Sequence, residues 1–268
     1  MSTLSPEPAK SGPSSRPEKS DPPATAGPGM IAFAQEQRAF VRPGFAWDSA
    51  AAYLFDIDGT LLNSRDAVHY FAFRNAMRDV LGIEAGIDGI PVHGNTDIGI
   101  LRAVLRRAGL RDDAINASLP AIIGRMRREV ESNRCQLNPE LCPSITELLT
   151  HLQQRGKVLG VVSGNLEAVG WLKLEKAGLK PLFSLASFSY PRELRVEIFR
   201  HGLSLAQEQL GHDGAVFIVG DTPSDIEAAR ATSTPVIALA TGIYSFGDLM
   251  ACGPDACMAC ATDLLELK

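Results

Sequence analysis

The sequence predicts a doubly wound α/β fold, in which helices cover both faces of a parallel sheet, with an all-helical insertion. Short apolar runs of strand length recur along the chain, and stretches with helical spacing of apolar residues separate them. Strands that alternate with helices in this way form crossover units and a parallel sheet. The insertion is predicted from one long interval, residues 64–142, that has helical spacing and no convincing strand.

The first predicted strand, Ala51–Asp58, is a continuous apolar run that ends in acids and a glycine. Such a run is typical of a parallel strand that is buried on both faces. Three similar runs and one weaker run follow, at residues 157–163, 215–221, 235–240 and 183–190. The predicted helices between them span residues 144–155, 166–177, 195–210 and 224–232.

The interval 64–142 carries apolar residues three and four positions apart, as in Ile98, Leu101, Val104 and Leu105. This spacing places apolar side chains on one face of a helix. We therefore predict a helical domain over residues 64–142 and an α/β domain formed by residues 30–63 and 143–268.

The N-terminal region is rich in Pro, Ser, Gly and charge, and Leu4 is its only large aliphatic side chain before Met30. A segment of this kind buries too little apolar surface to offset its ordering entropy, so residues 1–29 are predicted to be a disordered tail. Residues 30–49 contain Phe40, Phe45 and Trp47 and can pack on the domain, but their spacing specifies no element.

Charge and hydropathy exclude several classes of protein. The net charge of -5 and the pI near 5.6 argue against a dedicated nucleic-acid binder, which usually carries a basic face. No apolar run approaches the roughly 20 residues that span a bilayer, and the first residues lack the apolar core of a secretory signal. We therefore expect neither a membrane nor a nucleic-acid partner, and a cytoplasmic location.

The five cysteines are an odd number and are widely separated, unlike a disulfide framework. Cys257 and Cys260 have the spacing of a metal or redox pair, but no second pair or neighbouring His completes a zinc site. We interpret their short apolar run as an edge strand.

Polar residues collect where the predicted strands stop. The first strand ends in Asp56 and Asp58, the second in Ser163 and the third in Asp221. Ligands of open α/β sheets bind beyond the carboxyl ends of the strands, so these side chains are expected to line one crevice. A single acid at such a position is explained by helix capping, but several are not.

The acids also have the spacing of a metal site. Asp56 and Asp58 lie two residues apart and point to the same side of an extended strand. Their mutual repulsion is offset by a divalent cation, and Asp221 and Asp225 add the oxygen ligands that Mg²⁺ prefers. The segment Ser163-Gly164-Asn165 offers a hydroxyl and backbone N–H groups at a helix N-terminus, where phosphate binds well.

Three motifs carry a family resemblance: DIDGTL at 56–61, VVSGN at 161–165 and GDTPSD at 220–225. In this order they resemble the motifs of the haloacid dehalogenase-like (HAD) phosphatase superfamily, over roughly residues 50–268. The resemblance implies a three-layer, Rossmann-like sheet. The insertion is similar to the helical cap of the phosphoglycolate phosphatase-like branch, and GNTDIGIL at 94–101 is similar to a loop and helix of such caps.

The resemblance implies a role for each motif residue. Asp56 would attack phosphorus and form an aspartyl-phosphate, and Asp58 would act as acid and then as base. Mg²⁺ would be held by the side chains of Asp56 and Asp221 and the backbone carbonyl of Asp58, and Asp225 would support the metal or orient a cation. The predicted phosphate-binding residues are Thr60, Ser163, Gly164 and Asn165; capping and turn hydrogen bonds explain Thr60 and Ser163 equally well.

One expected residue is missing. The family usually has a Lys before the helix that precedes the GD motif, and residues 187–199 contain none. Arg195, at the predicted start of that helix, is our first choice for the cation, and Arg192 is the alternative. An Arg binds phosphate through two N–H groups, so it can fill the role with a different reach.

The substrate is expected to be a small phosphorylated molecule that the cap selects. His93, Asn95, Thr96 and Asp97 are candidates for contacts with its non-phosphate part, although a polar turn that caps a helix accounts for them as well. Alternatives on the same scaffold are a phosphomutase, a phosphonate hydrolase and a non-catalytic binding module. Residues 64–142 contain no Lys for a phosphonate imine, and retention of all four acids counts against a binding module. No pattern specifies an oligomeric state.

Overall fold

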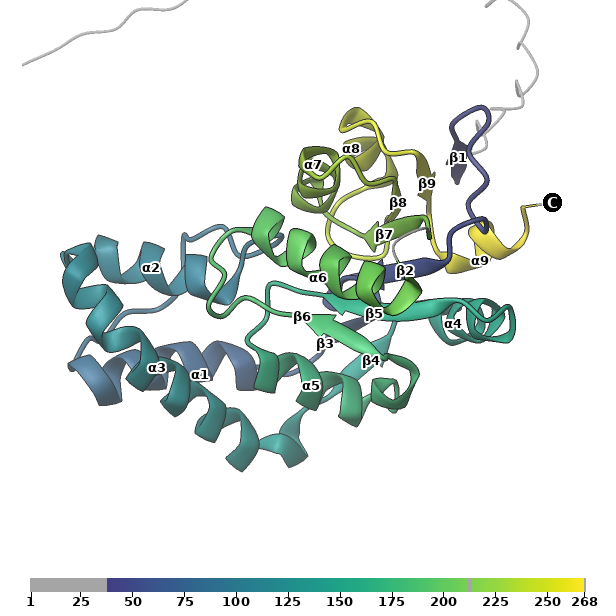
Figure 1. The fold of residues 1–268 in the computed structure, drawn as a ribbon. Helices are drawn as coiled ribbons and strands as arrows, with labels where there is room; N and C mark the ends of the chain where they lie inside the picture. The colour runs from purple at the N-terminus through teal and green to yellow at the C-terminus, as the bar shows by residue number, and fades with distance from the viewer. Residues whose placement is uncertain (1–37, 212–213, 268) are drawn as a thin grey trace, which may run out of the picture. The chain divides into compact units, whose positions relative to one another are not determined.

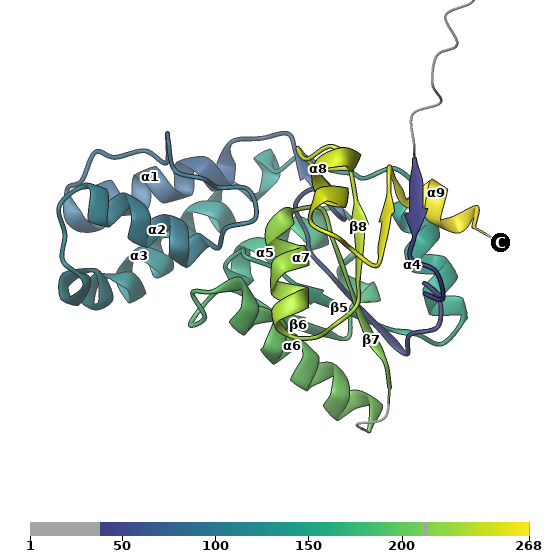
Figure 2. The same ribbon diagram turned by 90° about the horizontal axis from the view of Figure 1, so that it is seen from above.

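A computed structural model describes residues 38–211 and 214–267, so the predicted tail of residues 1–29 lies outside the described chain. The predicted fold class is confirmed. A seven-stranded sheet has the order β1-β9-β8-β7-β2-β5-β6, and every neighbouring pair in it is parallel except β1 with β9. Figures 1 and 2 show this sheet between two sets of helices.

The central strand β2 sets the geometry of the site. Its last residue, Phe55, is in register with Val161 of one neighbour and Val219 of the other, so three strands end at the same level. The sheet strands are β1 (Ala39–Val41), β2 (Ala52–Phe55), β5 (Val158–Val162), β6 (Leu185–Ser187), β7 (Val216–Gly220), β8 (Val236–Leu239) and β9 (Ala256–Met258).

Alternate residues of β2 enter two separate apolar clusters. Tyr53 and Phe55 pack towards α4 (Ile145–Gln154), α5 (Glu167–Lys176) and α9 (Ala261–Leu265), whereas Ala52 and Leu54 pack towards the helices of the other face. Those helices are α6 (Arg195–Leu210), α7 (Pro223–Ala231) and α8 (Phe246–Ala251). Truncation of a fully buried side chain such as Phe55 to Ala is expected to cost about 3–5 kcal/mol of stability.

The predicted helical insertion contains α1 (Val68–Leu81), α2 (Asp97–Arg107) and α3 (Asp112–Ser132), grouped together in Figure 2. Their inner faces share one apolar cluster that includes Phe73, Leu101 and Met126. Thr96 caps α2 by accepting the N–H of Gly99 at 2.9 Å. Two short 3-10 helices, Arg134–Gln136 and Lys180–Leu182, complete the helical elements of the described residues. The division into core (30–63 and 143–268) and cap (64–142) stays a prediction, and we use both names for these ranges.

The prediction that residues 64–142 contain no strand is wrong at their C-terminal end. A strand β4 (Pro139–Leu141) pairs antiparallel with β3 (Leu62–Ser64), with Leu62 opposite Leu141 and Ser64 opposite Pro139. A strand of three residues that is largely exposed shows no alternation, so its sequence could not indicate it. The two chain segments that join core and cap therefore lie side by side.

The interpretation of the Cys257 run as an edge strand is also wrong. The edge is β1, which pairs with β9 and places Cys257 opposite Phe40. The segment after β1 packs on the core, with the rings of Phe45 and Phe217 4.9 Å apart. Among the described residues, which include all five cysteines, the cysteines are free and belong to no group that could hold a metal.

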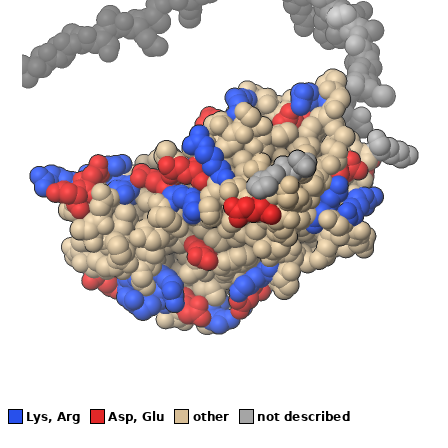
Figure 3. Space-filling model, viewed as in Figure 1, with Lys and Arg blue, Asp and Glu red and all other residues tan. Residues whose placement is uncertain are grey.

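Within residues 38–211 and 214–267, no helix is long and apolar enough to cross a membrane. The face of the molecule in Figure 3 carries Lys and Arg side chains interspersed with Asp and Glu. Many charged side chains of the described residues are paired, as in Arg106 with Asp112 at 2.8 Å and Arg125 with Asp79 at 2.9 Å.

Candidate active site

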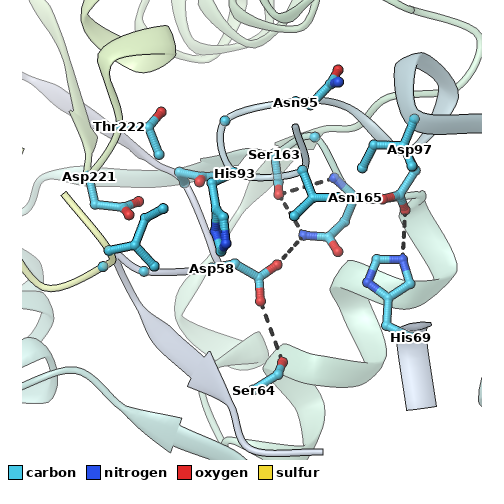
Figure 4. A pocket seen from close by; sticks show the side chains of 18 of the residues that line it. Asp58, Ser64, His69, His93, Asn95, Asp97, Ser163, Asn165, Asp221 and Thr222 are labelled. Carbon is cyan, nitrogen blue, oxygen red and sulfur yellow. Dashed lines mark hydrogen bonds and ion pairs between the residues drawn. The ribbon is translucent and has the colours of Figure 1, made fainter. Parts of the chain in front are cut away.

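A cavity of about 370 Å³ lies at the carboxyl ends of the strands, between core loops and the cap (Figure 4). Most of the predicted site residues line it, although they come from four separate segments. They are Asp56, Asp58, Ser163, Gly164, Asn165, Arg195 and Asp221. Thr60 and Asp225 lie directly behind this lining and are fully buried.

Asp56 follows β2 directly and is buried, with 5% of its surface exposed. Its carboxylate accepts from the guanidinium of Arg195 at 2.9 Å. Burial raises the pKa of Asp56 to about 6, with Asp225 and Asp58 adding repulsion and Arg195 opposing the rise. The carboxylate therefore holds negative charge in a place that does not fully compensate it.

Asp221 and Asp225 lie beside Asp56. Asp221 follows β7 and accepts the hydroxyl proton of Thr60 at 2.9 Å, and burial together with the charges of Asp225 and Asp56 raises its pKa well above the usual range. In Asp225, Oδ1 accepts from Arg195 at 2.8 and 2.5 Å and Oδ2 accepts from the N–H and hydroxyl of Thr222 at 3.0 and 2.7 Å. Both Asp225 oxygens are thus already engaged.

The three buried acids fit a divalent cation. One carboxylate oxygen from each of Asp56, Asp221 and Asp225 lies within 4.8 Å of the others, in the one such group found among the described residues. Three negative charges share the single guanidinium of Arg195, and oxygen donors are those that Mg²⁺ prefers. The glycines on either side are required by space, because a Cβ on Gly59 or Gly242 would lie 2.1 or 1.9 Å from Oδ2 of Asp221.

Arg195, our first choice for the missing cation, is the first residue of α6 and is 9% exposed. Its guanidinium joins Asp56 to Asp225. The alternative, Arg192, is not among the residues that line the cavity. The position of Arg195 therefore matches the predicted position of the cation.

Asp58 has different partners. Lys173 of α5 donates to both of its oxygens, at 2.9 and 2.7 Å, and the amide of Asn165 donates to Oδ2 at 2.7 Å. Partial burial raises the pKa of Asp58, but the Lys173 ammonium and the Asn165 amide outweigh it and hold that pKa below its usual range. The ammonium of Lys173 is itself buried, with 3% exposure.

The predicted phosphate-binding residues differ in their hydrogen-bond partners. Ser163 follows β5, and its hydroxyl oxygen accepts from the backbone and side-chain N–H groups of Asn165 at 3.3 and 2.9 Å, which leaves its own proton for a ligand. Asn165 is occupied by Asp58, Ser163 and Lys173. Thr60 donates to Asp221 instead of to the cavity.

Three of the four cap candidates also have partners. Thr96 donates to the carbonyl of Glu193 at 2.5 Å, Asp97 accepts from the N–H of Leu166 at 2.7 Å, and Asn95 donates to the carbonyl of Pro91 at 3.0 Å. His93 lines the cavity, and its ring is directed into it in Figure 4.

A family model described as haloacid dehalogenase-like hydrolase matches residues 53–239. The chain belongs to this family. The prediction of an enzyme of the HAD-like hydrolase family is therefore confirmed.

The proteins to which this HAD-like hydrolase is similar include ones named as phosphoglycolate phosphatases. The chain is 29% identical over 218 residues to a phosphoglycolate phosphatase of Synechococcus elongatus, and the aligned region covers 80% of this chain and 95% of that protein. A predicted phosphoglycolate phosphatase from Haemophilus somnus has the same fold, with a TM-score of 0.58, 22% identity and coverage of 82% and 99% of the two chains. CbbY from Rhodobacter sphaeroides in complex with phosphate matches with a TM-score of 0.60, 19% identity and coverage of 80% and 96%.

Sequence reasoning missed two residues of this HAD-like hydrolase, Lys173 and His69. Lys173 occupies a position on α5 where the spacing from Leu166 and Val169, both buried, calls for an apolar residue. A charged residue on the buried face of a helix needs a partner, and this was the available signal. His69 lies on α1 four residues before the buried Phe73, and no motif marks it.

Proposed function

We propose that this HAD-like hydrolase is a Mg²⁺-dependent phosphatase that hydrolyses a small phosphorylated metabolite through an aspartyl-phosphate on Asp56. The observation that carries the proposal is the unequal setting of two neighbouring carboxylates in one cavity. Asp56 lies among buried acids beside Arg195, and Asp58 is paired with Lys173 and Asn165. A nucleophile and an acid–base group need different surroundings of this kind.

Asp56, Asp221 and the backbone carbonyl of Asp58 would hold Mg²⁺, which supplies charge stabilisation to the phosphoryl oxygens when bound. Asp225 would keep Arg195 in place, because both of its oxygens are used by Arg195 and Thr222. The free hydroxyl proton of Ser163 would donate to a phosphoryl oxygen. Arg195 would orient Asp56 for attack and offset part of the charge that gathers there.

In the first step a carboxylate oxygen of Asp56 attacks phosphorus, and the bond between phosphorus and the ester oxygen breaks. The departing alkoxide takes a proton from Asp58. Lys173 favours the carboxylate form of Asp58 in the free protein, and a bound phosphoryl dianion is a nearby negative charge that raises the pKa of Asp58. The substrate therefore brings Asp58 into its acid form.

In the second step Asp58, now a carboxylate, takes a proton from a water molecule. The resulting hydroxide attacks the phosphorus of the aspartyl-phosphate, the bond to Asp56 breaks, and inorganic phosphate leaves. Asp58 regains the proton that it took up from solvent when the substrate bound and returns it to solvent when phosphate leaves, so the two steps together consume one water.

The cap wall of the cavity has an apolar part beside its polar residues. It contains Tyr70, Phe73, Ile87, Val92 and Ile100. The two cations that line the cavity, Lys173 and Arg195, are both paired with acids. Of the two histidines in the lining, His69 is paired with Asp97, and the ring of His93 is directed into the cavity. We infer a small substrate whose non-phosphate part lies against this wall and accepts a hydrogen bond from His93.

The proposal is tested by measuring inorganic phosphate release from a panel of phosphorylated metabolites with Mg²⁺, with the Asp56→Asn protein as the blank. The panel includes 2-phosphoglycolate, because the Synechococcus relative is named for it. We expect Mg²⁺-dependent release from at least one member. Equal release by the Asp56→Asn protein, or activity that survives chelation of all divalent metal, contradicts the proposal.

A further inference from the structure

A chain of hydrogen bonds runs from Asp58 into the cap through Lys173. The Lys173 ammonium, at the core end, contacts both oxygens of Asp58, Oδ1 of Asn165 at 3.0 Å and Nδ1 of His69 at 3.4 Å. An ammonium has three N–H donors and no acceptor, so these four acceptor atoms exceed its capacity, and at least one N–H is shared between two of them. Asp58 and Asn165 belong to the core, whereas His69 belongs to the cap.

The far side of His69 is fixed by a second cap residue. Its Nε2 lies 3.0 Å from Oδ2 of Asp97, as Figure 4 shows. A carboxylate only accepts, so the hydrogen-bond network assigns the proton to Nε2 and leaves the lone pair of Nδ1 facing Lys173. In this tautomer the Nε2–H of His69 donates to Asp97, and its Nδ1 accepts from Lys173.

Asp97 also fastens the cap to the core. The same Oδ2 accepts the N–H of Leu166 at 2.7 Å, and the N–H of Asp97 donates to the carbonyl of Gly164 at 2.7 Å. A Cβ on Gly164 would lie 2.4 Å from the carbonyl oxygen of Asn95, so only glycine permits this approach. Asp97 therefore reaches His69 while it holds α2 against the loop that carries Asn165.

We propose that Asp97 and His69 are positioning residues of the cap that align Lys173, and through it Asp58, only when the cap lies on the core. Opening of the cap removes the contact that the Lys173 ammonium makes with the cap, so that only core side chains then set its direction. The side chain of Asp58 is 41% exposed, so packing alone does not fix its direction. The proposal rests on the proposed function, because it assumes that Asp58 is the acid–base group.

The test compares two substrates that differ in their need for an acid. Glycerol 2-phosphate has an alkoxide leaving group that must be protonated. 4-Nitrophenyl phosphate has a stable leaving group, 4-nitrophenolate, that departs without a proton. His69→Phe keeps a ring beside Phe73, with which His69 stacks at 5.1 Å, but removes the acceptor. We expect kcat/KM for glycerol 2-phosphate to fall by about tenfold or more, and that for 4-nitrophenyl phosphate by less than about threefold.

A matched control lies on the same helix. Asn75→Ala removes a cap hydrogen bond to Glu129, 2.9 Å long, away from the cavity, and should lower neither value. Equal losses on both substrates for His69→Phe would mean a structural role only, and unchanged values would mean no role; either result overturns the proposal. Asp97→Ala should repeat the selective loss.

A double-mutant cycle tests whether His69 acts through Lys173. In a Lys173→Met background the His69→Phe change should have little further effect on glycerol 2-phosphate, whereas independent roles give additive losses. Failure of the proposed function gives a different result. If Asp58→Asn lowers kcat/KM equally for both substrates, the acid role of Asp58 is wrong, whatever His69 does.

Discussion

The two carboxylates of the DID segment, Asp56 and Asp58, stand two residues apart and have opposite electrostatic settings. Around Asp56, three buried acids share one guanidinium, and the pKa of Asp56 rises to about 6. Around Asp58, one carboxylate meets one ammonium, an amide and, at 3.4 Å, the hydroxyl of Ser64, and its pKa falls below the usual range. We call these two surroundings the Asp56 end and the Asp58 end of the cavity. The Asp56 end carries excess negative charge, whereas at the Asp58 end the negative charge of the carboxylate is matched by the positive charge of Lys173.

This difference separates what each end needs from outside the chain. Buried like charges stay ionised only when a further cation is present, so the Asp56 end calls for Mg²⁺. The Asp58 end is completed by side chains of the protein, one of which, His69, belongs to the cap. In the proposed function Mg²⁺ therefore completes one end, and in the further proposal the position of the cap completes the other.

The largest expected effect comes from the Asp56 end. Asp56→Asn should lower kcat by on the order of a thousandfold or more, because an amide cannot form the phospho-intermediate. Phosphate release measures the loss, and circular dichroism should show an unchanged fold. Asp58→Asn, the matched change at the other end, should slow both steps and keep phosphate binding. Substantial turnover by the purified Asp56→Asn protein would contradict the aspartyl-phosphate mechanism.

Loss of the guanidinium should have the next largest effect. Arg195→Ala should lower kcat/KM by on the order of a hundredfold, because removal of a donor to developing charge costs about 3–4 kcal/mol, and Arg195→Lys should restore part of it. Arg192→Ala is the control and should stay near wild type, since Arg192 does not line the cavity. A large loss for Arg192→Ala together with near wild-type activity for Arg195→Ala would instead assign the role of the cation to Arg192.

The charge imbalance also predicts a pH-dependent response to metal. A pKa of about 6 for Asp56, against 3.8 normally, means that the folded metal-free protein binds more protons than the unfolded chain between these values. The free energy of unfolding of the metal-free protein therefore falls as pH rises from about 4 to 6, and Asp56 alone contributes about 3 kcal/mol of this fall. Mg²⁺ should raise Tm more at pH 7.5 than at pH 5.0, by on the order of 5 °C.

Thermal unfolding with and without Mg²⁺ at the two pH values measures this difference. The Asp56→Asn protein is the control, because its amide does not titrate, and its metal response should depend less on pH. A larger Mg²⁺ shift at pH 5.0 in the wild type would show that the acids are not the ligands.

The smallest expected effect is at His93. His93→Ala should raise KM for the substrate that the panel identifies by about tenfold, the effect of one hydrogen bond to a polar group, with little change in kcat. Steady-state kinetics separate the two values. A fall in kcat with KM unchanged would instead place His93 among the groups that act on the reacting atoms.

The Asp56 end could be predicted from the sequence because its residues follow strand ends and stand in compact motifs. Asp56, Ser163 and Asp221 each come directly after a buried strand, and the level ends of those strands bring them together. Arg195 was found because a helix start fixes where a side chain lies. In each case a local pattern and one rule of sheet topology were sufficient.

The Asp58 end could not be predicted in this way. His69, Asp97 and Lys173 come from three helices, and their meeting depends on how α1 and α2 pack against α5, which helical spacing does not specify. The strands β3 and β4 were missed for a related reason, since three residues each carry no readable period. The roles assigned to the site residues stay predictions until the variants are measured.

The pairing of β3 with β4 has a consequence for how this chain can change. Because Leu62 lies opposite Leu141, the chain leaves the sheet domain and returns to it at the same place. We therefore expect the sheet to bring its strands together without α1–α3, and these helices to be exchangeable as a unit. Substitution, lengthening or replacement within this unit is expected to alter which molecules reach Asp56, while the strand ends that carry the acids stay where they are.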